Sequence, residues 1–407
     1  MKRVIEAGYP LSFRKKEAEE LGGHLNHHHS VVLIGMKRVG ISNFLRFFLS
    51  HYEATPQLFV QVDLNDLVEL NLSAFWTLIL TRLVDSVQRS PLPEGDKRAC
   101  RRMFVQAIQL KDHFFTMDSV RKVLETLTAG GLSPTLFLIR FDRLRKVTTP
   151  EFFSNLIGLR DSVKGKVSYV FTSFRPFNDL GPVFTKDIYL QPANTTDMQS
   201  ILETLEHEYH TTFNPKIREA LLMLAGGYVQ YLQLAIIRLR EEKTLPKNEK
   251  ELFSLLVADE QIIFQSEELF ESLTKKEKEA LLLGSDEREQ APYVWNTGIL
   301  SGRGKKPALF SPLFADFVSR QSMQSNGVNR EFTKKEHLLF TFLKIHENEL
   351  CERDRIIEAV WPESKELGVS DWAIDRLVAR LRSKLKQHAS PYSIVTVVTR
   401  GYKLVAS

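Results

Sequence analysis

Cysteine and long apolar runs are scarce in this sequence of 407 residues. It has only two cysteines, Cys100 and Cys351. Two thiols are too few for the disulfide framework of a small secreted protein, and they suit a reducing compartment. We find no apolar run long enough to span a bilayer and no signal peptide. These absences predict a cytoplasmic protein with no membrane partner.

An excess of charge of one sign is also lacking. The chain has 55 lysines and arginines against 50 acidic residues, a formal net charge of +5. Residues 330–407 have 14 basic against 11 acidic residues, a net of +3. Affinity for a polyanion must therefore rest on the local placement of cations or on more than one copy of the chain. The length predicts about two to four modules.

A metal-ligand cluster is the third absence. The histidines at 27–29, with His24 nearby, suggest a metal site at first sight. However, no cysteine or acidic ligand accompanies them, as a structural or catalytic metal site normally requires. We therefore predict a loop entering a strand, and no metal.

The N-terminal half contains the outline of a phosphate-binding loop that lacks its lysine. A short apolar strand at 30–34 leads through a glycine-containing loop into a helix at 43–51, which is the context of a Walker A motif. Ile41 stands where that motif has its lysine, so the β- and γ-phosphates lose their main side-chain cation. The remaining candidate contacts, which we interpret as vestigial, are Gly35, Lys37, Arg38, Gly40 and Ser42.

The strand expected to hold the magnesium-binding carboxylate has also changed. It is predicted at 135–139, and Arg140 follows it where an aspartate is expected, with Asp142 two positions further on. A cation thus replaces an anion at the metal position. These two losses predict that the chain has no catalytic residues and no required cofactor. Binding of ATP without hydrolysis stays open as an alternative.

The surrounding elements keep the order of a known ATPase architecture. A strand at 167–173 and a helical stretch at 196–242 follow the altered motifs. Residues 10–245 resemble the AAA+/STAND-type ATPases with a helical lid, in the group related to archaeal ORC/Cdc6 proteins. The resemblance implies the α/β P-loop fold more than the activity. The alternative is another α/β domain with an incidental glycine loop.

A basic amphipathic helix lies near the C-terminus, from Trp372 to Lys386. At about 100° per residue, one face is apolar and predicted to be buried: Ile374, Leu377, Val378, Leu381 and Leu385. The opposite face contains Trp372, Arg376, Ala379, Arg380 and Ser383, flanked by Arg382 and Lys384. Arginines on such a face can pair with guanine edges in the major groove, and flanking cations suit phosphates. Asp375 lies off this face and can orient an arginine. For the helix alone, an ordinary solvated surface is the alternative.

The flanking segments make this helix part of a specific pattern. The segment from about 331 to 407 resembles the OmpR/PhoB-type winged helix-turn-helix family. The matching positions are Thr333 with Glu336, Arg353 through Val360-Trp361, Ile374-Asp375, Val378, Leu381-Arg382, Lys384-Leu385, Thr396-Val397 and Gly401-Tyr402. The resemblance implies that Arg376 and Arg380 face bases and that Arg382 and Thr396 face phosphates. Arg400 is shifted by two residues from the family's wing cation and is the candidate for a minor groove.

A local repeat predicts a second winged helix upstream. The sequence Thr-Lys-Lys-Glu occurs at 274–277 and again at 333–336, each time as a capping-box pattern before an apolar helix. A helix, a strand, a tight turn and a second strand are expected after the first copy. Asp286, Glu287 and Glu289 make its helix acidic, so we expect a structural or autoinhibitory role there rather than DNA reading.

These patterns predict an α/β P-loop domain with a helical lid, followed by two small winged-helix (α+β) domains. The expected boundaries are a degenerate P-loop domain at 1–195, the lid at 196–255, a structural winged helix at 256–325 and the DNA-binding winged helix at 326–407.

The predicted function is that of a bacterial transcriptional regulator that reads double-stranded DNA. The inactive ATPase-like module would act as a scaffold, through a protein partner or self-association. A non-hydrolysing nucleotide switch is one alternative. The other is a structural adaptor in a larger defence, mobile-element or replication complex.

Overall fold

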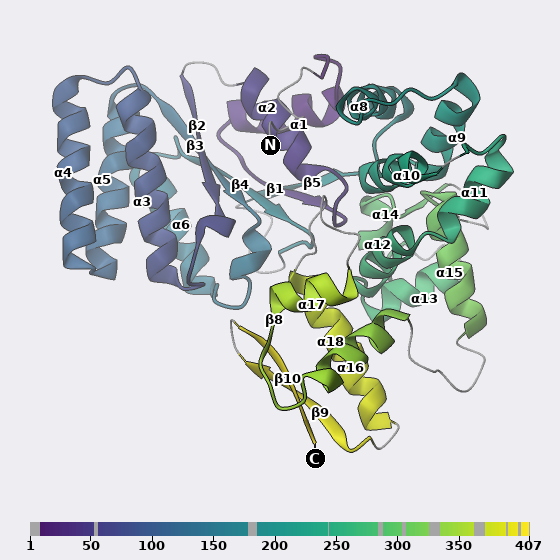
Figure 1. Cartoon of the computed structure of the whole chain (residues 1–407). Coiled ribbons are helices and arrows are strands. Elements are labelled where there is room, and N and C mark those ends of the chain that lie inside the picture. Colours follow the sequence, from purple (N-terminus) through teal and green to yellow (C-terminus); the bar gives the residue numbers. More distant parts are fainter. Residues whose placement is uncertain are drawn as a thin grey trace. The chain divides into compact units, whose positions relative to one another are not determined.

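The computed structural model describes residues 9–52, 56–177, 185–242, 244–283, 288–302, 307–324, 334–361, 371–387, 390–397 and 400–406. The chain divides into two compact units, Met1–Ser322 and Met323–Ser407 (Figure 1). Within the described ranges, none of the helices combines the length and apolar character needed to cross a membrane.

The first unit is built on a five-stranded parallel sheet with the order β2-β3-β4-β1-β5. Its strands are β1 (Ser30–Gly35), β2 (Gln57–Asp63), β3 (Ser133–Ile139), β4 (Ser168–Ser173) and β5 (Thr185–Leu190). Every residue of β1 and β4 is buried. Burial on both faces explains why the central residues of these two strands, 31–34 and 169–171, are apolar.

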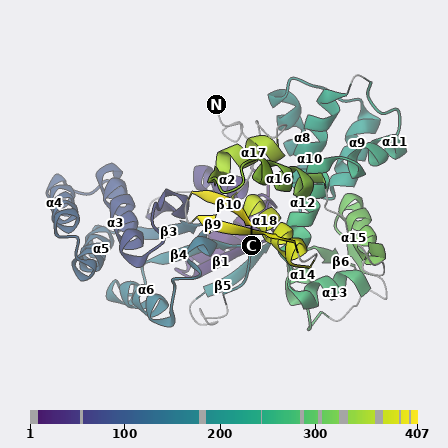
Figure 2. The same cartoon turned by 60° about the horizontal axis from the view of Figure 1, so that its bottom comes forward.

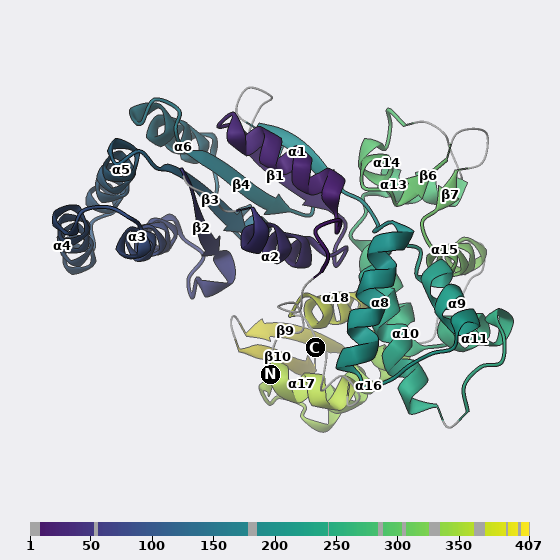
Figure 3. The same ribbon diagram turned by 90° about the horizontal axis from the view of Figure 1, so that it is seen from above.

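Helices cover both faces of this sheet (Figure 3). The helix α1 (Lys15–Asn26) lies on one face, and α2 (Ile41–His51), which follows the glycine loop after β1, lies on the other. The helix α6 (Pro150–Ser162) connects β3 to β4. The central strand, glycine loop and helix, set in a parallel sheet, confirm the predicted α/β P-loop fold.

A three-helix layer connects β2 to β3. It consists of α3 (Leu72–Arg89), α4 (Glu94–Leu110) and α5 (His113–Ala129). Side-chain caps begin two of these helices: Asn71 accepts from Ala74 N–H at 2.8 Å, and Asp112 accepts from Phe115 N–H at 2.7 Å. The helix α4 is the outermost of the three (Figures 1 and 3).

Helices beyond the β5 edge of the sheet form the lid and the segment after it. The lid helices are α8 (Thr195–Glu208), α9 (Pro215–Ala225), α10 (Val229–Glu241), α11 (Glu249–Val257) and α12 (Glu260–Glu271). The next segment contains α13 (Lys275–Leu283), α14 (Pro292–Asn296), β6 (Leu300–Ser301), β7 (Ala308–Leu309) and α15 (Pro312–Gln324). The helix and the two strands expected there are present, while most of the turn between the strands lies outside the described residues. The domain boundaries inside this unit stay predictions. Of the acidic residues expected on its helix, Asp286 and Glu287 lie outside the described residues, and Glu289 lies in a turn between α13 and α14 rather than on a helix.

The first Thr-Lys-Lys-Glu copy forms its capping box. Glu277 Oε2 accepts from Thr274 N–H at 2.7 Å, and Glu277 N–H donates to Thr274 Oγ1 at 3.4 Å. The same carboxylate accepts two bonds from Arg175, at 2.7 and 2.9 Å, and this guanidinium lies 3.9 Å from the ring centre of Tyr293. Because Arg175 follows β4, the buried glutamate links the sheet to α13 and α14.

In its described residues, the second unit has three helices, α16 to α18, and an antiparallel wing (Figure 2). Its elements are α16 (Lys334–Ile345), β8 (Cys351–Glu352), α17 (Arg353–Val360), α18 (Asp371–Gln387), β9 (Tyr392–Val397) and β10 (Gly401–Ala406). The strand order is β8-β10-β9. This confirms the predicted winged helix and adds β8, a strand of two residues that the sequence analysis did not predict. Thr333, the predicted cap of α16, lies outside the described residues.

Gly401 allows the wing to pair with β8. It lies opposite Glu352 in the strand register, and a Cβ at Gly401 would lie 2.0 Å from Cys351 O. No real Cβ tolerates that approach to a carbonyl, so a substitution must push the two strands apart.

We predict that Gly401→Ala destabilises the wing by about 1–3 kcal/mol, the usual cost of forcing extra atoms into a packed site. Hydrogen exchange of the β9 and β10 amides in the full chain measures this as faster exchange. Gly95→Ala is the matched control, because nothing lies within 4 Å of a Cβ built at that helical glycine. Unchanged protection of the wing in Gly401→Ala would contradict the packing argument.

Candidate nucleic-acid interface

The helix α18 buries one face against the rest of the second unit. All five predicted apolar residues are buried: Ile374, Leu377, Val378, Leu381 and Leu385. Asp375, Ala379, Ser383 and Lys386 are exposed, and Arg376 is partly exposed. The side chain of Trp372 lies outside the described residues. The predicted division of the helix into an anchoring face and a solvent-facing face is therefore confirmed for its described side chains.

Two of the predicted DNA contacts are turned toward a carboxylate of the same unit. Lys384 Nζ lies 2.5 Å from Glu336 Oε2, and Arg380 Nε lies 3.8 Å from Glu336 Oε1. The Glu336 side chain is 1% exposed, against 21% for Arg380. Burial lowers the pKa of Arg380 to about 10. Arg380 thus lies at the edge of the exposed face, because α16 packs along that side of α18.

A third predicted cation joins α18 to the wing. Arg382 Nε donates to Ile394 O at 2.8 Å, and its Nη2 donates to Thr396 Oγ1 at 2.8 Å. The structure thus brings together the two residues that the family resemblance assigns to phosphates. Their mutual bond fixes where the wing lies relative to the helix.

Tyr402, on β10, contacts charged groups from two other elements. Its hydroxyl donates to Asp375 Oδ1 of α18 and accepts from Arg353 Nη2 of α17 at 3.3 Å. Arg353 Nη2 also lies 2.6 Å from Asp375 Oδ1. Burial, together with the bond to Asp375, raises the pKa of Tyr402 to about 12. Asp375 therefore orients an arginine, as the sequence suggested, and that arginine is Arg353.

The wing tip presents a cation to solvent. Arg400 is exposed, and its N–H donates to Val397 O at 3.1 Å, which closes the turn between β9 and β10. Thr396 is exposed on the neighbouring strand. Sequence analysis missed the anchoring role of Glu336, which it interpreted only as a helix cap, since no local pattern links that residue to α18.

The two cations of the glycine loop in the first unit are paired with a buried carboxylate. Lys37 Nζ lies 3.6 Å from Glu268 Oε1, and Arg38 Nε lies 3.4 Å from Glu268 Oε2. Glu268 belongs to α12 and is 5% exposed. Burial lowers the pKa of Lys37, and the Glu268 carboxylate opposes that shift. The hydroxyl of Tyr228 also donates to Lys37 O at 2.7 Å.

Apolar atoms fill the base of the same loop. A Cβ at Gly35 would lie 2.8 Å from Val39 Cγ1 and 3.2 Å from Ile41 Cδ1. Val39 is completely buried, and Gly40 has a φ of 107°, a conformation that favours glycine. Ser42 is partly exposed on the first turn of α2.

At position 140, where the Walker-type pattern has a metal-binding carboxylate, the structure has an ion pair. Arg140 Nη1 donates to Asp63 Oδ2 at the end of β2. Although burial opposes it, the bonds from Arg140 and from Asn65 N–H lower the pKa of Asp63. Asp142 accepts from Ser173 Oγ and Phe174 N–H, both at 2.9 Å, while burial raises its pKa. Asp142 therefore organises the turn after β4.

The histidines form a surface group. His24 Nδ1 and His29 Nδ1 lie 3.5 Å apart, and His27 stacks on His29. Among the side chains that the structure describes, no three histidine, cysteine or acidic residues are grouped so that they could hold a metal ion.

Comparison with known proteins identifies the second unit. Residues 327–404 match the family model described as "Transcriptional regulatory protein, C terminal". The chain is 31% identical over 90 residues to the transcriptional regulatory protein YxdJ of Bacillus subtilis, which covers 22% of this chain and 38% of that protein. It is 28% identical over 132 residues to the response regulator protein GraR of Staphylococcus aureus, which covers 30% of this chain and 58% of that protein.

The chain thus spans 38% and 58% of the lengths of these two curated relatives. The matches confirm that the C-terminal unit has an OmpR/PhoB-type winged-helix domain.

Solved structures with a similar overall arrangement are ATPases and origin-recognition proteins. One is the Walker-type ATPase paby2304 of Pyrococcus abyssi, with 13% identity, a TM-score of 0.47 and coverage of 78% of this chain and 100% of that one. Another is the Aeropyrum pernix ORC1 protein in complex with DNA, with 13% identity, a TM-score of 0.41 and coverage of 99% and 92%. The fold assignment rests on the strand order β2-β3-β4-β1-β5 and on the glycine loop after β1.

The anchoring role of Glu336 leads to a prediction. We expect Glu336→Gln to destabilise the packing of α18 on α16 by about 3 kcal/mol, because two largely buried cations lose their counter-charge. Faster hydrogen exchange in α16 and α18 of the full chain is the readout. Glu352→Gln is the matched control, since Glu352 is exposed and its side chain makes no capping bond. Equal exchange in both variants would show that Glu336 does not anchor α18.

Proposed function

We propose that this protein is a bacterial transcriptional regulator that binds double-stranded DNA through its C-terminal winged helix. The observation that carries the proposal is the geometry of α18. Its apolar face is buried, while its other side carries the partly exposed Arg376 and the wing carries the exposed Arg400. Guanidinium groups on such a helix face fit the major groove, and a basic wing tip fits the neighbouring backbone or minor groove. The family match at 327–404 supports the same function.

The proposed contacts divide by their surroundings. Arg376 and the exposed edge of Arg380 face bases, and Trp372 is added to them from the sequence pattern alone. Arg382 and Thr396, which the resemblance assigns to phosphates and which are bonded to each other, and the flanking Lys384 would fix the position of the DNA backbone without reading sequence. Arg400 at the wing tip faces the minor groove or its phosphates.

We further propose that the first unit is a scaffold or docking module without ATPase activity. Three arrangements support this interpretation. Glu268 engages Lys37 and Arg38, Ile41 replaces the loop lysine, and Arg140 pairs with Asp63 where a metal-binding carboxylate is expected. A nucleotide would have to displace an internal carboxylate from the cations that remain. The unit therefore serves the protein by its shape and its surfaces.

The DNA proposal predicts that two arginines behave differently. A duplex site is first selected from random DNA with the full chain, and affinities are then measured at several salt concentrations. Arg376→Ala should lose about 1–3 kcal/mol on the selected site, because a bidentate base contact is removed, and much less on random DNA. Arg380→Ala should also weaken binding to the selected site more than binding to random DNA. Arg400→Ala should weaken both duplexes equally and reduce the salt slope by about 1.

Lys146→Ala is the control for these variants, since Lys146 is exposed in the first unit and should have no effect on DNA affinity. Equal losses from Arg376→Ala on selected and random DNA would remove Arg376 from base reading. Failure of the wild-type chain to bind any duplex at low salt would overturn the proposed function itself.

The scaffold proposal predicts no calorimetric heat when ATP and magnesium are added to the wild-type chain. Glu268→Gln should release Lys37 and Arg38, and inorganic tripolyphosphate should then bind measurably. Glu249→Gln, at an exposed position of α11, should behave as the wild type. Saturable heat from ATP with the wild-type chain would favour the nucleotide switch over the scaffold.

A further inference from the structure

Exposed apolar side chains gather at one end of the three-helix layer. Short turns join α3, α4 and α5, so the start of α3, the end of α4 and the start of α5 lie together. Of the 13 large hydrophobic residues that are exposed in the described part of the chain, six belong to this end or the turn before it: Val68, Leu70, Val105, Ile108, Leu110 and Phe114. A cluster of this kind marks an interaction surface more often than scattered single residues do.

The outward face of α4 adds charge to this apolar end. The helix buries only Cys100 and Ala107. Arg98, Arg101 and Arg102 are exposed and, among the described residues, no ion pair includes any of them. Helical spacing places these arginines in line with Val105 and Ile108. We define the α4 face as these five residues, which present a basic half and an apolar half to solvent.

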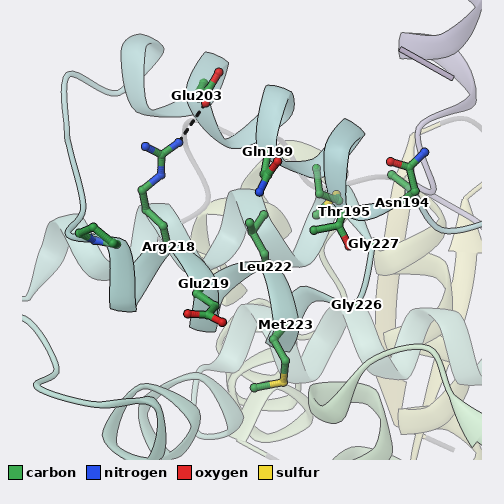
Figure 4. A pocket seen from close by; sticks show the side chains of 13 residues that line it. Asn194, Thr195, Gln199, Glu203, Arg218, Glu219, Leu222, Met223, Gly226 and Gly227 are labelled. Carbon is green, nitrogen blue, oxygen red and sulfur yellow. Dashed lines mark hydrogen bonds and ion pairs between the residues drawn. The ribbon is translucent and has the colours of Figure 1, made fainter. Parts of the chain in front are cut away.

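A groove of complementary character lies in the lid, between α8 and α9 (Figure 4). It has a volume of about 910 Å³, and its lining includes Met198, Leu222 and Met223. Met223 is 41% exposed, so part of this apolar lining is open to solvent. Apolar side chains of a partner helix would find both room and apolar contact there.

The rim of this groove is acidic. Glu203 and Glu219 line it, and Arg218 lies 3.3 Å from Glu203 and 3.6 Å from Glu206. Two carboxylates thus flank Arg218, and a third carboxylate, that of Glu219, lines the same groove. Glu219 is exposed, and none of the ion pairs among the described residues includes it. The groove therefore offers carboxylates to an arginine-bearing helix.

We propose that the α4 face of one copy docks into the α8–α9 groove of a second copy. Within one copy the two surfaces lie beyond opposite edges of the sheet, α4 beyond β2 and the lid beyond β5 (Figures 1 and 3). They therefore meet only between copies. Because the two surfaces differ, the contact is head-to-tail and builds a ring or an open chain of copies.

The charge of the second unit supplies a reason for such assembly. Its net charge of +3 is modest, and Glu336 engages two of its cations. Affinity for DNA then gains from several copies bound side by side. The proposed contact rests on the scaffold role proposed above, because that role gives the assembly its use. The experiment that tests the contact requires no DNA.

Sedimentation velocity of the full chain at low salt tests the proposal. The wild type should form species larger than a dimer that dissociate as salt rises. Arg101→Glu/Arg102→Glu and Glu219→Lys should each weaken association by roughly tenfold or more. Mixed together, these two variants should associate again, because each keeps one intact surface and the two reversed surfaces, acidic on α4 and basic in the groove, are again of opposite charge. Ile108→Ser tests the apolar half without changing charge, and Lys250→Glu, at an exposed site on α11, is the control.

Two results would overturn the proposal. One is a wild-type chain that stays monomeric at high concentration and low salt, which would leave these surfaces to a different protein. The other is an assembly that persists in the folded charge-reversal variants and in Ile108→Ser. Loss of DNA binding with assembly intact would instead count only against the function proposed for α18.

Discussion

The buried carboxylate of Glu336 is the contact on which the second unit depends. It accepts a short bond from Lys384 and lies beside Arg380, so it fixes both the position and the rotation of α18 on α16. A charge buried to this extent is tolerated only when cations surround it, and the cations in turn lose their hydration. The apolar stripe anchors the helix, but an apolar contact permits small rotations that a paired charge does not. The side of α18 that is turned away from α16 is therefore set by a glutamate on another helix.

The same short sequence is used twice for this purpose. In the first unit, Glu277 closes its capping box and also holds Arg175, which follows β4 and stacks on Tyr293. In the second unit, Glu336 holds cations of α18. Each glutamate lies near the start of a helix, where it is favourably placed near the helix dipole, and each is buried by neighbouring elements. The glutamate of this helix-capping sequence thus also makes a long-range contact, with a different partner in each unit.

Much of this arrangement could be predicted from the sequence, because periodicity and spacing are local properties. The buried stripe of α18, the wing around Gly401-Tyr402 and the strand, loop and helix around Gly35 all follow from such patterns. The partners of Lys37, Arg380 and Arg140 could not be predicted in this way. Each is paired with a carboxylate far away in the sequence, and no pattern within a helix or strand identifies Glu268, Glu336 or Asp63. The sequence therefore predicts which cations are candidate contacts, while only the fold shows which of them are paired with carboxylates.

The cluster around Tyr402 reduces the conformational entropy that the second unit would lose on binding a partner. Its hydroxyl, Asp375 and Arg353 join α17, α18 and β10, while Arg382 joins α18 to β9. Long basic side chains usually lose much conformational entropy when a ligand immobilises them. Here that entropy has already been lost during folding of the unit. Helix and wing would meet a partner as one preformed surface, so a poorly fitting sequence could not be accommodated by rearranging one of them alone.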